Sequence, residues 1–193
     1  FEQALIIIMA EAQKFNIALK ENEESLMEAQ KDIYPDTFIL PINLSSLDGI
    51  NKSKKELQVL KSSSKEFRTK VLNHFKKYEQ AILKRINNTK YADQIIKGAK
   101  ESANITINYQ DILNEQYEVI GEILDFCTKA ISEETIQYIA NEDNIFFTTD
   151  ELVDEYNRLI ETFNKILYDA KDAQKKMLEF YMQKNQKIKK DLN

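Results

Sequence analysis

The sequence predicts an all-α protein, an elongated up-and-down four-helix bundle with long helices and with its apolar connecting loops gathered at one end. Only three glycines and two prolines punctuate 193 residues, so the turn signals that a many-stranded sheet requires are missing. Apolar residues also recur at helical spacing over long stretches. Hydrophobic residues at 42% and charged residues at 31% fit a folded chain. We therefore expect a single helical-bundle domain over residues 1–193.

The first helix is expected at roughly 1–33, where apolar residues alternate in steps of four and three. The series runs from Phe1 to Ile33 and contains one polar member, Asn22. This spacing is typical of a heptad seam, and Pro35 ends it. Asn22 either is buried and fixes the register of the helix or lies where the seam meets solvent, and the spacing leaves both readings open.

The middle of the chain predicts two further helices. One covers roughly 52–86, with apolar steps of three, four and four, which approaches an eleven-residue repeat. The other covers 90–131, with a break expected near 104–108, where the sequence Asn-Ile-Thr-Ile-Asn interrupts the pattern. Its second half has an apolar stripe wider than a coiled-coil seam.

The last helix is expected at 148–190. Thr148 followed by Glu151 has the spacing of a capping box, in which the two residues satisfy free backbone amides at the helix start. In an up-and-down bundle, both termini then lie at one end. The connections 34–51 and 132–147 lie together at the other end.

Two apolar clusters lie in these connections and form the first candidate site. A contiguous exposed apolar patch of several hundred Å² is rare in soluble monomers. The clusters therefore either pack on one another as a lid over the core or form a tip that binds a partner or inserts into a membrane. The residues are Phe38, Ile39, Leu40, Ile42, Leu44, Ile145, Phe146 and Phe147.

Charge alternates along the chain. Residues 51–90 carry 12 basic and 3 acidic groups, whereas residues 91–165 carry 5 and 16. The simpler interpretation is that opposite charges select which helices pair, and the alternative is a binding face. The topology would also gather basic residues at the end that holds both termini, where a membrane surface would attract them. This candidate basic, membrane-proximal end comprises Lys84, Arg85, Lys90, Lys184, Lys187, Lys189 and Lys190.

The chain offers little for catalysis or metal binding. His74 is the only histidine, so a di-iron bundle site with its two Glu-x-x-His pairs is excluded. We interpret His74 as a polar residue at the edge of an apolar face. Cys127 is the only cysteine, and no Gly-rich phosphate loop is present. We expect no enzyme activity, no cofactor, no metal and no nucleic-acid partner.

These observations predict a non-catalytic helical-bundle protein of the bacterial cell envelope that binds a protein or a small ligand. Because the chain begins with Phe1, we expect that a removed N-terminal segment tethered it to the membrane. One alternative is an intracellular adaptor, inhibitor or immunity-type module in the cytoplasm. Another is a membrane-active protein that inserts its apolar loop. The sequence leaves the oligomeric state open.

Overall fold

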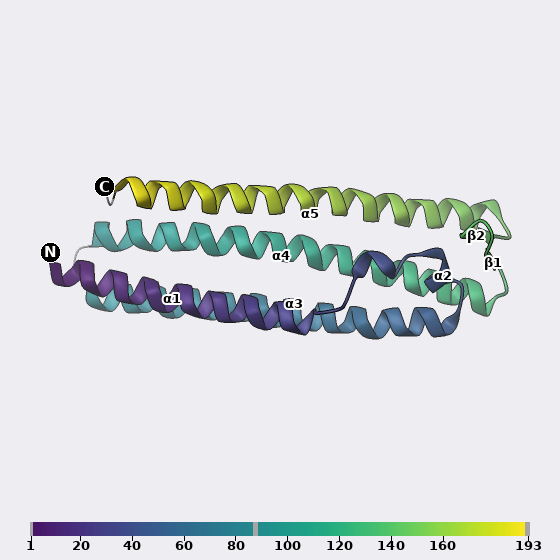
Figure 1. The fold of residues 1–193 in the computed structure, drawn as a ribbon, viewed down its shortest axis with the longest axis horizontal. Coiled ribbons are helices and arrows are strands. Elements are labelled where there is room, and N and C mark those ends of the chain that lie inside the picture. Colours follow the sequence, from purple (N-terminus) through teal and green to yellow (C-terminus); the bar gives the residue numbers. More distant parts are fainter. Residues whose placement is uncertain (1, 87–88, 192–193) are drawn as a thin grey trace. The chain divides into compact units, whose positions relative to one another are not determined.

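The computed structural model describes residues 2–86 and 89–191, with side chains described in 6–86 and 92–183. Its long helices are α1 (Glu2–Ala29), α3 (Leu47–Arg85), α4 (Thr89–Ser132) and α5 (Asp150–Asp191). The prediction of an all-α protein is confirmed, and α3 packs against α4, as α4 does against α5. Figure 1 shows these elements along the chain.

Two compact units divide the chain, and α3 and α4 run through both. Unit 1 comprises Phe1–Lys31 and Ser63–Gln110. Unit 2 comprises Asp32–Ser62 and Asp111–Asn193. Each unit is therefore assembled from segments that are distant in sequence.

Unit 1 joins α1 to the second half of α3 and the first half of α4. Its core has two small clusters. In one, Phe15 of α1 packs on Tyr78 of α3 with ring centroids 5.2 Å apart, beside Ile96 of α4. In the other, Phe67 and Ile107 bring α3 and α4 together.

Unit 2 has the larger core. Its buried residues come from the first half of α3, the second half of α4 and the first part of α5, with Leu60, Ile120 and Phe163 as examples. The connecting segments contribute further buried side chains to the same cluster. Figure 1 shows these connections at the end of unit 2 where α5 begins.

The first connection is more ordered than the sequence suggests. It forms a 3₁₀ turn, Pro35–Thr37, and a one-turn helix α2, Pro41–Leu44. Proline at the first position suits a helix start, because its missing N–H would be unsatisfied there. The structure also corrects the start of the second long helix from 52 to Leu47.

The first helix ends earlier than expected, at Ala29 rather than at 33. The N–H of Lys31 bonds to the carbonyl of Glu28, three residues back, at 3.3 Å. Asp32 then adopts φ 63°. A tightened last turn followed by a left-handed residue is a common helix end.

The expected break near 104–108 is wrong, because α4 is continuous through it. The hydroxyl of Thr106 donates to the carbonyl of Ser102 at 3.2 Å, and Ser102 in turn donates to that of Gly98 at 3.1 Å. Hydroxyls bonded four residues back allow a helix to continue. Ile107 also faces the core.

The second connection, expected as a loop, is a β-hairpin. Strand β1, Ile136–Ile139, pairs antiparallel with β2, Asn144–Phe147, in a register that places Ile139 opposite Asn144. The four-residue turn between them closes with the N–H of Glu142 on the carbonyl of Ile139 at 3.1 Å, and Asp143 adopts φ 45°. Turns of this length are common in hairpins.

The start of α5 is capped one residue later than the predicted Thr148. The helix begins at Asp150, and the Oγ1 of Thr149 accepts a bond of 3.4 Å from the N–H of Leu152. This is the geometry of an N-cap residue. Hydrogen bonds to its own backbone N–H and to the Thr149 side chain lower the pKa of the Glu151 carboxyl.

Candidate functional site

The apolar segment of the first connection turns two of its side chains into the core of unit 2. Phe38 is 1% exposed and Leu44 is fully buried. The Nδ2 of Asn43 donates to the carbonyl of Thr37 at 2.6 Å and so ties α2 to the preceding 3₁₀ turn. Ile39 is partly buried against the same core.

The hairpin also places side chains in the core of unit 2. Ile145 is buried, and Phe147 packs between Phe126 of α4 and Tyr156 of α5, with ring centroids 5.3 and 5.1 Å away. The Tyr138 hydroxyl donates to the Oδ1 of Asp143 at 3.0 Å and fixes the hairpin turn. The strand pair thus packs against α4 and α5.

The other residues of the predicted site point outward. Leu40 and Ile42 are 43% and 52% exposed, and Phe146 of β2 is 43% exposed. Leu47, which the sequence analysis did not select, is equally exposed at the start of α3. The sequence feature that could have identified Leu47 is its place as an apolar residue immediately before Asp48, at a helix start. We call the four exposed residues Leu40, Ile42, Leu47 and Phe146 the hairpin-end surface.

Close packing positions this surface. Helix α2 packs against β2, and Gly49 in the first turn of α3 lies directly against the backbone of α2. A Cβ atom at Gly49 would lie 2.5 Å from the carbonyl oxygen of Asn43. Because no side chain fits there, glycine sets how closely α2 approaches α3.

The segments around the hairpin-end surface are strongly acidic. Residues 32–51 and 132–151 contain no Lys or Arg. Such a surface favours a partner with cationic groups around an apolar centre. The exposed acidic residues are Asp32, Asp36, Asp48, Glu133, Glu134, Glu142, Asp143, Asp150 and Glu151.

The predicted basic end is described only in part. Lys84 is exposed in the last turn of α3. Arg85 makes an ion pair with Glu11 of α1. The side chains of Lys90, Lys184, Lys187, Lys189 and Lys190 lie outside the described ones. The gathering of these residues at one end stays a prediction.

Ion pairs link basic residues of α3 to acidic residues of neighbouring helices. In unit 2, Lys54 reaches Asp125 at 2.6 Å and Lys61 reaches Glu118 at 2.7 Å. In unit 1, Arg85 pairs with Glu11. These contacts fit the simpler reading of the charge alternation, in which opposite charges select helix neighbours.

Glu11 is the most deeply buried of these acidic groups. The Nζ of Lys14 lies 2.9 Å from its Oε1. This hydrogen bond, helped by Arg85, lowers the pKa of the carboxyl despite the opposing effect of burial. His74 is half-buried on α3.

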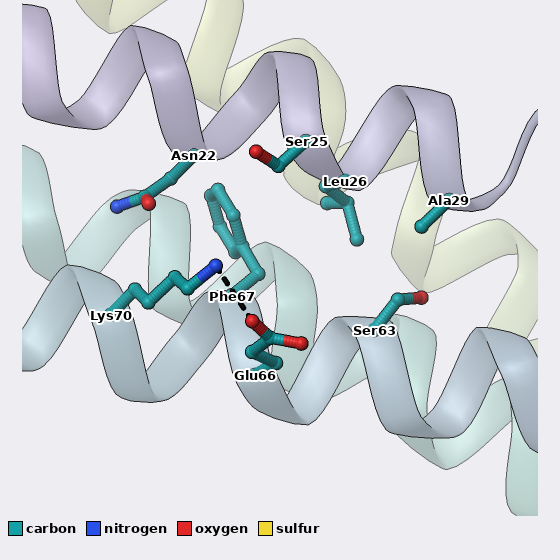
Figure 2. Close-up of a pocket in the computed structure, with 8 residues that line it drawn as sticks. All are labelled: Asn22, Ser25, Leu26, Ala29, Ser63, Glu66, Phe67 and Lys70. Atoms are coloured by element: carbon teal, nitrogen blue, oxygen red, sulfur yellow. Dashed lines mark ion pairs between the residues drawn. The ribbon is translucent and has the colours of Figure 1, made fainter.

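Asn22 is 8% exposed, so of its two readings the buried one holds. Its Nδ2 has no hydrogen-bond acceptor among the described residues. Figure 2 shows Asn22 beside a cavity between α1 and α3, where Lys70 and Glu66 form an ion pair of 2.6 Å. The cavity has a volume of about 40 Å³, far below the ≈ 300 Å³ or more of a small-molecule site.

A second surface feature lies on α1 of unit 1. The residues on one side of this helix form a shallow, open groove. Ile6, Met9 and Ile17 are 65%, 63% and 50% exposed there. The heptad spacing of α1 predicted only its buried seam and not this exposed face.

Among the described side chains, no group of three or more His, Cys, Asp or Glu could hold a metal ion. Across the described helices, none combines the length and apolarity needed to cross a bilayer. Comparison with protein-family models, curated proteins and solved structures finds no match to this chain.

Proposed function

We propose that this chain is a non-catalytic binding protein of the bacterial cell envelope, which contacts a protein partner through the hairpin-end surface. The proposal includes an up-and-down arrangement of the long helices. The observation that carries the proposal is the division of one apolar segment, in which Phe38 and Leu44 are buried while Leu40 and Ile42 are exposed.

The anchoring of this surface in the core of unit 2 favours recognition. Its exposed side chains stand on elements whose other side chains are anchored in the core, so little conformational entropy is lost when a partner binds. Apolar side chains at the centre with charged groups around them are typical of protein interfaces. The acidic surroundings call for a partner that carries Lys or Arg around an apolar contact.

The same charges argue against membrane insertion as the main activity. Anionic headgroups repel carboxylates, and the two largest buried side chains of the segment, Phe38 and Leu44, are committed to the core. A membrane-active protein would float with neutral or anionic vesicles, and we expect this chain to stay in the soluble fraction. The alternative of a cytoplasmic adaptor differs from the envelope protein in its location in the cell. Fractionation of the producing cells distinguishes the two.

Site-specific photo-crosslinking in the cells that make the protein tests the contact itself. A benzophenone amino acid at Ile42 should yield one discrete protein adduct in the envelope fraction. The same group at Tyr168, an exposed aromatic position on α5, is the matched control and should yield none. Absence of an Ile42-specific adduct, or equal adducts from both positions, contradicts the proposal.

A further inference from the structure

We propose that the partner of the hairpin-end surface adds an extended segment to the outer edge of β1 and so becomes a third strand of the sheet. The segment has an uncharged centre with Lys or Arg at both ends. Addition of a strand to an exposed sheet edge is a general mode of peptide recognition. This inference rests on the proposed function, because it specifies how the same partner binds.

The hydrogen bonds of the hairpin leave two residues of β1 with backbone groups that point away from β2. The N–H of Thr148 bonds to the carbonyl of Thr135 at 3.0 Å. Hydrogen-bonded and non-hydrogen-bonded pairs alternate along an antiparallel ladder. In the observed register, Gln137 therefore bonds to β2, whereas the N–H and C=O groups of Ile136 and Tyr138 face outward.

These outward-facing groups form a free edge. Among the described residues, none forms a backbone hydrogen bond with Ile136 or Tyr138 at this edge. Backbone polar groups are seldom left unpaired away from water, and Gln137 between them is exposed. The two donors and two acceptors therefore face solvent, where they match the groups that a further strand presents.

The opposite edge of the sheet is closed. Helices α2 and α5 pack against β2. The side chain of Ile145 is buried, and its outward-facing N–H bonds to the Oδ1 of Asn144 at 2.9 Å. A further strand therefore joins the sheet beside β1. All of these elements belong to unit 2, in which residues 111–132 of α4 form about 33 Å of continuous helix that ends shortly before β1.

Strand β1 lacks most of the features that protect an edge strand from pairing. Its residues 136–139, Ile-Gln-Tyr-Ile, include no charged residue and no proline, and its register with β2 is continuous, without a bulge. Charges, prolines and bulges are the usual means of blocking an edge. Only its shortness restricts pairing, because it limits an added strand to the four residues of β1.

Acidic residues flank both ends of this edge. Glu134 precedes β1, and Glu142 and Asp143 lie in the turn that follows it, all of them exposed. Residues 132–151 contain no Lys or Arg that could balance them. Four strand residues extend about 13 Å. A segment with about four uncharged residues between its Lys or Arg residues therefore places a cation beside the carboxylates at each end.

The added strand is continuous with the hairpin-end surface. Gln137 of β1 pairs with Phe146 of β2, and both side chains are exposed, so they share the outer face of the sheet. A strand beside β1 places alternate side chains on that same face. The partner segment thereby extends the contact that Phe146 makes in the proposed function.

The charges also argue against a second copy of this chain as the third strand. Two hairpins joined along their β1 edges would bring the acidic ends of one strand close to those of the other. Like charges that lie opposite one another in a sheet are destabilising. A basic segment of a different protein gains from the same carboxylates.

Amide hydrogen exchange, measured by NMR with a synthetic peptide, tests the pairing. The peptide has alternating Thr and Val at its centre and two Lys at each end. Binding should slow exchange at Ile136 and Tyr138 at least about tenfold, because their N–H groups gain acceptors. Exchange at Gln137, which already bonds to β2, should change little.

Two further peptides are the matched controls. One is N-methylated at alternate residues on the side that would face β1, so it lacks the backbone donors for pairing. The other carries Glu in place of each Lys. Both should bind at least about tenfold more weakly than the basic peptide, the first through lost hydrogen bonds and the second through charge repulsion.

A backbone substitution in the protein isolates a single donor. Replacing Tyr138 by p-hydroxyphenyllactate keeps the side chain but exchanges the outward N–H for an oxygen. Binding of the basic peptide should weaken about fivefold, the effect of one hydrogen bond. The same replacement at Tyr34, which is exposed in the first connection, is the control and should leave binding unchanged. Circular dichroism establishes that both proteins retain their fold.

Cross-linking in cells separates this inference from the proposed function. A benzophenone amino acid at Gln137 should yield the same protein adduct as at Ile42. An adduct from Ile42 with none from Gln137 would overturn the added strand and leave the proposed function standing. Absence of the Ile42 adduct would instead contradict the proposed function itself.

Three results with the purified protein would also overturn the added strand. In the first, the basic peptide leaves exchange at Ile136 and Tyr138 unchanged up to about 1 mM, the limit of weak binding. In the second, the N-methylated peptide binds as well as the basic one. In the third, protection of the two amides without peptide grows with protein concentration, which would assign the edge to a second copy.

Discussion

At the residue scale, Asn22 illustrates the stability that is lost when a polar group is buried in a helical seam. Its buried Nδ2 lacks an acceptor among the described residues, and a free cavity of about 40 Å³ adjoins it. Asn22→Leu should therefore raise the free energy of unfolding by about 1 kcal/mol, because the desolvated donor disappears and the side chain fills part of the cavity. Urea unfolding measures the change, and a lower stability would mean that the amide is satisfied in solution.

The second residue-scale prediction concerns alkaline pH. Burial raises the pKa of Cys127 to about 12 from a usual value of 9.0. Burial, with a contribution from Cys127, also raises the pKa of Tyr156 to about 12 from 10.0. Both groups are neutral when protonated, so the folded state binds these protons more tightly than the unfolded state. Their contribution to stability is complete below about pH 9 and is lost as pH rises toward 12.

Cys127→Ala isolates this effect. The variant loses some packing at every pH, but its stability should fall less steeply than that of the wild type between pH 9 and 10.5. Urea midpoints at pH 7, 9 and 10.5 provide the comparison. Parallel curves for the two proteins would show that the thiol does not contribute.

At the element scale, Gly49 controls the junction of α2 and α3. Gly49→Ala should lower the free energy of unfolding by roughly 1–3 kcal/mol, because the new methyl group meets the backbone of Asn43. Gly98→Ala in α4 is the matched control. Nothing lies within 4 Å of a Cβ there, so alanine should stabilise the helix by about 0.5–1 kcal/mol. Equal effects at both sites in thermal unfolding would refute the role of Gly49.

The end of α4 offers another element-scale prediction. Glu134 has φ 57°, and the N–H of Thr135 bonds to the carbonyl of Ala130 at 2.8 Å. This is a Schellman motif with glutamate at the position that favours glycine. Glu134→Gly should stabilise the protein by roughly 1 kcal/mol through relief of left-handed strain. Glu133→Gly, one residue earlier, should destabilise it, and calorimetry compares the two.

How far the sequence predicts these elements depends on their length. Repeated apolar steps specify the long helices well, since each adds to the same stripe. The hairpin was missed because its strands have four residues each and its turn lacks glycine, using Asp143 in a left-handed conformation instead. The break in α4 was wrongly expected because hydroxyl bonds to the preceding turn do not show in residue type alone.

The candidate site was predictable in composition but not in orientation. The clustering of apolar residues identified both connections as one region. In the first connection, the conformation of α2 decides which of these side chains are buried and which are exposed. Because Pro41 begins a helical turn, side chains follow helical rather than strand periodicity. Leu44 consequently faces the core while Ile42 faces out. Such a turn of four residues carries too little pattern to be read from sequence.

At the scale of the whole molecule, two units with different cores share α3 and α4. Unit 2 has the larger apolar core, around residues such as Leu60 and Ile120, whereas more of the buried polar residues lie in unit 1, including Glu11, Asn22 and Gln110. Buried polar residues reduce stability relative to apolar ones. We expect amides of α1 to exchange with deuterium faster than those of unit 2, in hydrogen exchange at neutral pH.

The central claim is that one apolar segment serves both the core and an exposed contact surface. The free energies of unfolding of Phe38→Ser and Ile42→Ser, measured in urea under the same conditions, test it most directly. The structure predicts a loss of about 3–5 kcal/mol for Phe38→Ser and of less than about 0.5 kcal/mol for Ile42→Ser. Losses of similar size at both positions would contradict the division.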